Sequence, residues 1–343
     1  MGRQLSRKSS FQQVISRAIA LGFRPKRSAH GAVKQIQATI RSGYRHCVDM
    51  DLSKFFDRVQ HDVLLVRVAR KIHDKRLLKL IGRYLRAGVM VDGIRQTTSE
   101  GTMRAPTRSV GRGPLSPLLA NILLDDFDKE LERRELRFVR YADDFLVFTK
   151  TAAAAERVYR SVESYLTRKL KLVVNHQKSR VCSANGVEFL GYQFHGYSGQ
   201  IRISPKSLAK FNERIHEILN RNRGMSMTSR LAELKLYLRG WIGYFALEQR
   251  KTILTDMDKR IRRLIRACYW KSWRLPRTRI SKLIGLGISK SDAFAFGNSR
   301  KGHMRMSPTS ALQRGLSNAY LAARGLFNLT DRWSELAPLR RTA

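Results

Sequence analysis

Three aspartates stand at positions where a solvated surface would not need a carboxylate. Asp51 follows a short apolar segment, and Asp143 and Asp144 belong to the run YADD between two apolar stretches. Adjacent carboxylates at the tip of a β-hairpin can point to one side of a sheet, whereas successive side chains of a straight strand alternate. If the segment before Asp51 pairs beside that hairpin, the three carboxylates meet at one edge of the sheet.

Carboxylates gathered in this way repel one another and raise their own pKa values. Divalent cations relieve the repulsion, and Mg²⁺ prefers hard oxygen ligands while it keeps positions open for phosphate oxygens. Two such ions about 4 Å apart can activate a hydroxyl and stabilise the leaving oxygen of an in-line phosphoryl displacement. The arrangement therefore predicts synthesis or cleavage of phosphodiesters. Taken singly, a double Asp is more often turn chemistry, and Asp49 reads as a solvated or supporting residue.

The charge of the chain indicates a polyanionic partner. Its 343 residues include 67 Lys and Arg against 27 Asp and Glu, which gives a formal net charge of +40. Nucleic acid is the usual polyanion, because each neutralised phosphate releases condensed counterions. Charge alone does not separate an enzyme from a basic binding protein without chemistry. An apolar fraction of 43% suffices for folded cores and excludes wholesale disorder.

The sequence contains few signals for a membrane or for a particular cellular compartment. No stretch approaches the ~18 apolar residues of a membrane span, and no apolar signal core follows the basic N-terminus. Cys47, Cys182 and Cys268 lie far apart in the sequence without a CxxC pair, which argues against a disulfide framework and a structural zinc cluster. We therefore expect a cytoplasmic protein that does not contact a membrane.

The elements that must position the carboxylates follow in a consistent order. The sequence predicts a strand leading to Asp51, amphipathic helices, a helix capped by Ser116 with Pro117 in its first turn, and a hairpin over 136–149. A helix capped by Thr151 comes next. Two further strands are predicted over 170–175 and 187–194. This order favours an α+β fold in which helices cover one face of an antiparallel sheet.

Beyond Pro205 the pattern becomes helical, so we place a domain boundary there. In LTDMDKRIRRLIRACYWKSWR, Thr255 and Asp258 have the spacing of a capping box at a helix start. An apolar stripe runs along the same segment, and basic residues cover the remainder.

Six motifs occur in an order that identifies the chain as resembling the group II intron-encoded reverse transcriptases with a maturase domain. They are DMDLSKFFDRVQHDVLL, GPLSPLLANILLDDFDKEL, RFVRYADDFLVF, LKLVVNHQKSR, VEFLGYQF and GWIGYF. The similarity begins at FRPKRSAH (23–30) and extends almost to the C-terminus. It implies a right-hand polymerase palm followed by an all-α thumb. The expected divisions are 1–46 (remnant of the fingers), 47–204 (palm), 205–290 (thumb or maturase domain) and 291–343 (basic helical tail).

The resemblance also implies roles for individual residues of the palm. Asp51, Asp143 and Asp144 would hold two Mg²⁺ ions, with Mn²⁺ as an alternative, and the backbone carbonyl of Leu52 would be a further ligand. Lys178 would lie near the departing pyrophosphate. Phe56 would exclude the 2′-hydroxyl of a ribonucleotide, although without the motif core packing is the more frequent role of such a phenylalanine.

Other motifs are assigned to substrate contacts. FLGY resembles the primer-grip hairpin, with Phe189, Leu190 and Gly191. Arg24 and Gly113 resemble positions near the template or incoming nucleotide. GWIGYF (240–245) resembles a thumb signature, in which helix core is more frequent than base stacking. The expected contacts with RNA phosphates are made by a set of basic side chains, namely Arg260, Arg263, Arg266 and Lys271.

Two departures from the family pattern leave a second function open. Only 22 residues precede FRPKRSAH, so we expect most of the fingers segment to be missing. The loop before PLSPLLAN reads EGTMRAPTRSVGRG, with Arg112 where the family has glycine. The expected partners of an active polymerase are an intron RNA template, a DNA primer and dNTPs. The alternative is a catalytically impaired maturase-type RNA-binding protein or a decaying retroelement fragment, and a homodimer is left open.

Overall fold

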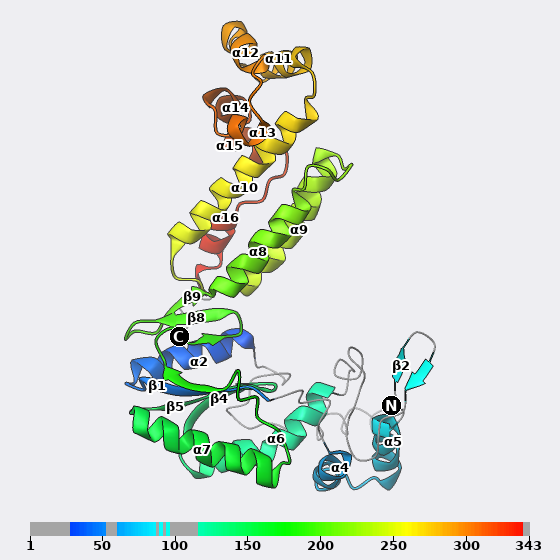
Figure 1. The fold of residues 1–343 in the computed structure, drawn as a ribbon, viewed down its shortest axis with the longest axis vertical. Helices are drawn as coiled ribbons and strands as arrows, with labels where there is room; N and C mark the ends of the chain where they lie inside the picture. Colours follow the sequence, from blue (N-terminus) through cyan, green and yellow to red (C-terminus); the bar gives the residue numbers. More distant parts are fainter. Residues whose placement is uncertain (1–27, 53–59, 87–88, 92–93, 97–115, 339–343) are drawn as a thin grey trace. The chain divides into compact units, whose positions relative to one another are not determined.

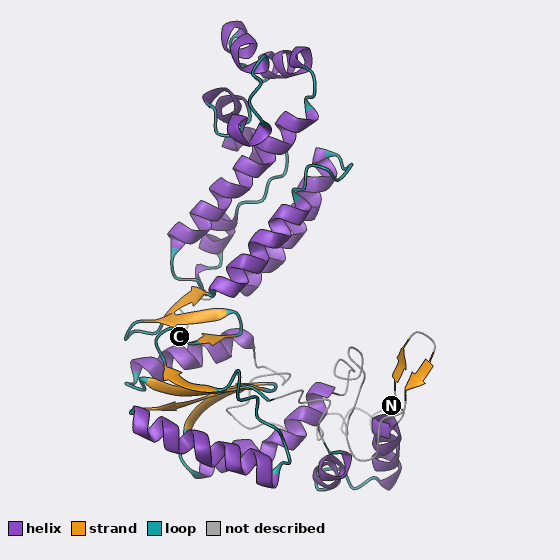
Figure 2. Ribbon diagram, viewed as in Figure 1, coloured by secondary structure: helices purple, strands orange, loops and turns teal. Residues whose placement is uncertain are grey.

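The computed structural model describes residues 28–52, 60–86, 89–91, 94–96 and 116–338 of the chain. The chain divides into two compact units, Met1–Gln200 and Ile201–Ala343. Strands are concentrated in the first unit, and the second is almost entirely helical (Figure 2). Within the described ranges, no helix combines the length and the apolar character that a membrane crossing requires.

A four-stranded antiparallel sheet in the order β4-β5-β1-β6 is the centre of the first unit. Its strands are β1 (His46–Met50), β4 (Arg137–Tyr141), β5 (Asp144–Thr149) and β6 (Arg180–Ser183). β1 lies between β5 and β6, with Met50 opposite Phe145 and Asp49 opposite Arg180. The expected pairing of the first strand beside the 136–149 hairpin is therefore confirmed.

Helices cover both faces of this sheet. α7 (Ala152–Lys169) and α6 (Ser116–Arg133) lie on one side, and α2 (Ala29–Arg41) lies on the other (Figure 1). α7 begins as predicted, because the Thr151 hydroxyl accepts a hydrogen bond of 3.2 Å from the Ala154 N–H. The α+β fold class is confirmed, and the layer formed by α2 adds a second covered face.

The first unit contains further helices and strands. They are α4 (His61–Ala69), α5 (Lys75–Arg86), β2 (Val89–Val91), β3 (Ile94–Gln96), β7 (Glu188–Phe189) and β8 (Tyr192–His195), with β9 (Gln200–Ile203) at the boundary between the units. The core joins Leu64 of α4 and Phe127 of α6 to Phe145 of β5. Burial of these apolar side chains is the main stabilising contribution at the sheet.

Two of the predicted strands are wrong. Residues 170–175 follow the end of α7 as a loop in which Lys171 has φ +55°, and the extended pairing is limited to a bridge between Val174 and Leu52. Residues 187–194 form a tight hairpin rather than one strand, because Leu190 and Gly191 adopt φ +50° and +78°. Positive φ at both central residues is the geometry of a type I′ turn, which reverses the chain within two residues.

Helices α8, α9 and α10 begin the second unit. Their bounds are Pro205–Ile218, Met227–Tyr244 and Lys251–Ser272. Shorter helices follow: α11 (Pro276–Gly285), α12 (Lys290–Gly297), α13 (His303–Met306), α14 (Ser310–Gly315), α15 (Asn318–Ala323) and α16 (Leu329–Glu335). The ring of Trp241 lies 4.4 Å from that of Phe211, and Leu238 is fully buried. Within GWIGYF, Phe245 is buried as expected, whereas Tyr244 is exposed, so its predicted place in the helical core is wrong.

The capping box predicted at Thr255 and Asp258 is wrong. α10 begins at Lys251, so Thr255 lies inside the helix and its hydroxyl donates to the Lys251 carbonyl at 3.2 Å. Asp258 is buried and caps a different helix. Its carboxylate accepts hydrogen bonds from the N–H groups of Leu329 and Thr330, both at 3.0 Å, and so satisfies the N-terminus of α16.

Replacement of this carboxylate tests the role of the buried cap. We expect Asp258→Ala to lower the free energy of unfolding by about 3 kcal/mol, because two N–H groups lose a charged acceptor. Asp256→Ala on the same helix is the matched control, since its ion pair with Lys259 is exposed and contributes little. Urea denaturation of both variants measures the difference, and equal stability would contradict the assignment.

Candidate active site

The strand register brings the three aspartates to one edge of the sheet. The β1–β5 ladder ends at the pair Met50–Phe145, so Asp51, which follows β1, and Asp144, the first residue of β5, lie at the same edge of the sheet. The hairpin pairs Tyr141 with Asp144, which leaves Ala142 and Asp143 as a two-residue turn. The convergence expected from sequence is thus present in the backbone.

The turn that carries Asp143 has an unusual backbone. Ala142 has φ +59°, a conformation that costs an L-residue roughly 1–2 kcal/mol. The guanidinium of Arg140 donates from Nη1 to the Ala142 carbonyl at 2.8 Å and holds this peptide in place. Strained backbone of this kind persists only where surrounding contacts determine it.

A buried polar network lies directly behind the turn. Arg140 is completely buried, and its Nε and Nη2 donate to the two carboxylate oxygens of Asp128 at 2.7 and 2.5 Å. Its Nη1 also donates to the Asn121 side-chain oxygen at 3.0 Å. Asn121 and Asp128 both belong to α6, seven positions apart and so on one face of the helix. The helix thereby fixes the hairpin that presents Asp143 and Asp144.

A second group of residues holds Asp51. The Asn175 side-chain amide donates to Asp51 Oδ2 at 3.1 Å, and Lys178 Nζ lies 3.7 Å from the same oxygen. The backbone is also fixed, because the Asp51 N–H donates to the Ser179 hydroxyl at 3.1 Å and its carbonyl accepts from the Asn175 N–H at 2.9 Å. The segment 175–179 therefore orients Asp51 from the opposite side to the hairpin.

The electrostatic environment disfavours ionisation of the turn carboxylates. Partial burial raises the pKa of Asp144 to about 6, with further contributions from the charges of Asp143, Asp51 and Asp49, while Lys178 opposes the shift. Burial also raises the pKa of Asp143, and the charge of Asp51 adds to this effect. The Asp144 side chain is nevertheless exposed to solvent, as a ligand for an incoming cation must be.

The donor chemistry fits a divalent cation, although the geometry of a closed metal site is not present. Within the part of the chain that the structure describes, no three His, Cys, Asp or Glu side chains are grouped tightly enough to hold a metal ion. Three carboxylates with mutual repulsion are nevertheless the hard oxygen donors that Mg²⁺ prefers. Leu52 follows Asp51 and pairs with Val174, and its side chain is buried. The role of its carbonyl stays a prediction.

The other predicted site residues of the first unit fall into two groups. Phe189 is buried, and Leu190 and Gly191 form the turn between β7 and β8. Three residues lie outside the described residues, namely Arg24, Phe56 and Gly113. Their predicted contacts with the nucleotide stay predictions.

The predicted RNA contacts on α10 are not equivalent. Arg260, Arg263 and Lys271 are exposed. Arg266 as a phosphate contact is wrong, because the structure buries it and directs its Nε to the Leu316 carbonyl at 3.0 Å. This buried guanidinium stabilises the second unit by pairing with backbone. The spacing of arginines along the sequence does not reveal that contact.

Five residues that support the candidate site were missed from sequence: Asn121, Asp128, Arg140, Asn175 and Ser179. One signal was available, since a basic residue lies within the apolar strand RFVRY and needs a buried partner. The identity of that partner depends on the packing of α6 against the hairpin.

Comparison with known proteins agrees with this geometry. The sequence model of the reverse transcriptase (RNA-dependent DNA polymerase) family matches residues 8–194, and the group II intron maturase-specific domain matches residues 208–283. The first match spans the four-stranded sheet, and the second spans α9 and α10 with most of α8 and α11.

Curated relatives show the same similarity. The chain is 29% identical over 214 residues to Protein YkfC of Escherichia coli, covering 51% of this chain and 54% of the relative. It is 26% identical over 263 residues to the group II intron-encoded protein LtrA of Lactococcus lactis, covering 57% of this chain and 43% of the relative. The chain thus spans about half the length of these two relatives.

Among solved structures, a telomerase from Candida tropicalis in complex with a fragment of telomeric RNA is similar with a TM-score of 0.45. The identity is 13%, and the match covers 97% of this chain and 56% of that chain. A TM-score this low supports no further conclusion about this chain.

The buried network behind the turn leads to a stability prediction. We expect Asp128→Ala to lower the free energy of unfolding by about 3–5 kcal/mol, because it leaves the Arg140 guanidinium buried without its counter-charge. Glu130→Ala is the matched control on α6, since neither of its partners, Arg133 and Arg134, is buried. Chemical denaturation compares the two, and a loss below that of Glu130→Ala would contradict the network.

The raised pKa of Asp144 leads to a pH prediction for the metal-free protein. The folded state favours the protonated carboxyl, so its stabilising effect is complete below pH ~4 and is lost as pH rises through about 6. Asp144→Asn should therefore gain melting temperature relative to wild type between pH 4 and pH 7 in EDTA. Mg²⁺ at pH 7 should stabilise wild type more than the variant. A pH-independent difference would contradict the assigned pKa.

Proposed function

Since the chain belongs to the reverse transcriptase family, we propose that it is an RNA-directed DNA polymerase of the group II intron type. It extends a primer 3′-hydroxyl with dNTPs on an RNA template. The single observation that carries the proposal is the register that ends the β1–β5 ladder at Met50–Phe145, next to Asp51 and Asp144, beside the turn that bears Asp143. The family match over residues 8–194 supports it. Residues 47–204 are the proposed palm.

In this proposal Asp51, Asp143 and Asp144 hold two Mg²⁺ ions, with Mn²⁺ as a substitute. When bound, the ions would supply activation of the primer hydroxyl and neutralisation of the leaving pyrophosphate. Burial raises the pKa values of Asp143 and Asp144, and repulsion from neighbouring carboxylates raises them further, which supports a cation in this position. The Leu52 carbonyl is the proposed backbone ligand.

The other residues of the chain orient these ligands and the substrate. Asn175 holds the Asp51 carboxylate, and Arg140 holds the turn that carries Asp143. Lys178 has an exposed ammonium group 3.7 Å from Asp51, and we assign to it the neutralisation of charge on the departing pyrophosphate. Phe56 is the proposed gate against ribonucleotides. Contacts to the nucleotide or template are assigned to Arg24 and Gly113, and primer contacts to the 189–191 turn.

The second unit is the proposed RNA-binding part of the protein. The maturase-specific match over residues 208–283 supports binding of intron RNA and assistance in splicing. We assign phosphate contacts to the exposed side chains of Arg260, Arg263 and Lys271. Residues 205–290 are the proposed thumb or maturase domain, 291–343 the proposed basic tail, and 1–46 the proposed fingers region.

The maturase match also favours a second candidate function. The chain would then be an RNA-binding splicing protein without polymerase activity. The two candidates differ in what the carboxylates do. A splicing protein needs the basic surface of its helical unit, whereas a polymerase needs the acidic edge of the sheet as well.

Primer extension on poly(rA)/oligo(dT) with Mg²⁺ separates these functions. We expect Asp143→Asn to lower dTMP incorporation at least 100-fold, because loss of a metal ligand removes several kcal/mol of transition-state stabilisation and each 1.4 kcal/mol is about tenfold. Glu156→Gln, an exposed carboxylate on α7, is the matched control with the same change in charge. Filter binding of structured intron RNA should not distinguish the two variants.

Equal incorporation by wild type and Asp143→Asn would contradict the site assignment. Absence of incorporation by wild type, together with tight and salt-sensitive RNA binding, would establish the splicing protein instead.

A further inference from the structure

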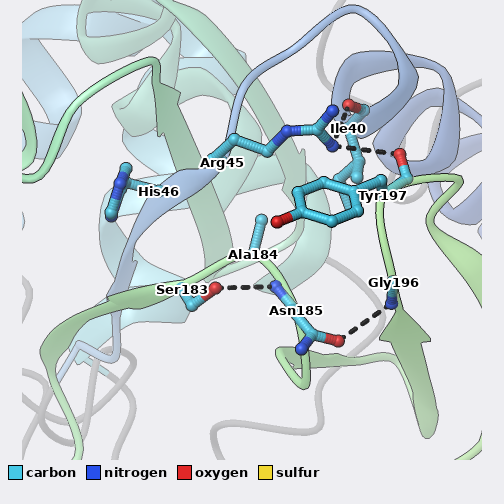
Figure 3. A pocket seen from close by; sticks show the side chains of 8 residues that line it. All are labelled: Ile40, Arg45, His46, Ser183, Ala184, Asn185, Gly196 and Tyr197. Atoms are coloured by element: carbon cyan, nitrogen blue, oxygen red, sulfur yellow. Dashed lines mark hydrogen bonds between the residues drawn. The ribbon is translucent and has the colours of Figure 1, made fainter.

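A second site lies at the end of the sheet away from the carboxylates. Asp51 follows the last residue of β1 and Arg45 precedes the first, so the strand separates them by ~20 Å. At the Arg45 end a cavity of about 320 Å³ opens between the end of α2, the end of β6 and the turn after β8 (Figure 3). Every lining residue belongs to the first unit.

A stacked cation and aromatic ring form one wall of this cavity. The guanidinium carbon of Arg45 lies 4.6 Å from the centroid of the Tyr197 ring (Figure 3). The position of Arg45 is fixed, because its Nη1 donates to the carbonyls of Ile40 and Tyr197 at 3.1 and 3.0 Å. Tyr197 is 80% exposed, so most of its ring surface is open to a ligand. A large aromatic side chain that remains this exposed is a candidate binding surface rather than part of the core.

The polar groups around the cavity favour an anionic ligand. His46 and Asn185 contribute to the lining, and the residues that line the cavity include no carboxylate. Lys150 follows the residue that faces His46 across the β1–β5 ladder, and its Nζ lies 5.8 Å from the Tyr44 ring centroid. Basic side chains interleaved with aromatic rings are the pattern that binds single-stranded nucleic acid, since rings stack on bases and cations neutralise phosphates.

We propose that this cavity, the Arg45–Tyr197 pocket, binds one or two nucleotides of a single-stranded nucleic acid segment. A base stacks on the ring of Tyr197, and the guanidinium of Arg45 pairs with a flanking phosphate. The site binds without metal and without the three aspartates. It therefore gives the protein a contact with nucleic acid separate from the proposed polymerase site and from the helical unit.

Photocrosslinking of the full-length protein tests the pocket. The probe is a uridine octamer with one 4-thiouridine, irradiated in EDTA, and the crosslinked peptide is mapped by mass spectrometry. We expect a crosslink at Tyr197 or its neighbours in the pocket. Tyr197→Ala should lower its yield and weaken competition by unlabelled octamer about 5- to 100-fold, the range for loss of one base–aromatic stack. Tyr197→Phe retains the ring and should behave as wild type.

Further variants and competitors identify the ligand and exclude misfolding. The Asp143→Asn protein should give the same crosslink, so failure of the polymerase proposal leaves this test unaffected. A deoxyuridine octamer that competes equally would show that the pocket does not read the 2′-hydroxyl, as expected for stacking. If Tyr197→Ala melts early, Arg45→Lys replaces it and should also reduce the yield, because lysine cannot preserve the planar stack. The proposal is overturned if the Ala variant crosslinks as wild type.

Discussion

The buried ion pair between Arg140 and Asp128 is the interaction on which the candidate active site depends. Both side chains are removed from water, so their charges must satisfy one another, and removal of either partner would leave an isolated buried charge. The planar guanidinium uses the donors not occupied by Asp128 to reach Asn121 and the Ala142 carbonyl. One side chain therefore connects the rigid helix α6 to the strained turn.

This constraint has an electrostatic consequence at the edge of the sheet. With the turn fixed, Asp143 and Asp144 stay partly buried and cannot move away from Asp51. Burial raises their pKa values, and the charge of Asp51 raises them further. Lys178 offsets part of the repulsion, but its ammonium is largely exposed and interacts at 3.7 Å. Divalent cations would relieve the remaining repulsion more effectively. The fold thus holds several carboxylates close together, which is the property that a two-metal phosphoryl-transfer site requires.

Local patterns in the sequence were sufficient for the elements that carry the carboxylates, but not for the contacts that hold them. The apolar runs around YADD predicted the hairpin, and the Thr151 cap predicted the start of α7. The partners of Arg140 could not be predicted, because charges in a core pair through space. Asp258 likewise caps a helix 71 residues away, and Cys47 and Cys182, 135 residues apart, have Sγ atoms 3.4 Å from each other as free thiols. Such contacts depend on register and packing, which short motifs do not encode.

Manganese binding followed by electron paramagnetic resonance tests the central claim most directly. The account predicts two Mn²⁺ ions per chain with the spin coupling of neighbours about 4 Å apart, and loss of the coupled pair when Asp51 is replaced by Asn. An uncoupled spectrum in wild type, or a coupled spectrum that persists without the Asp51 carboxylate, would contradict the claim that these aspartates form one dimetal site.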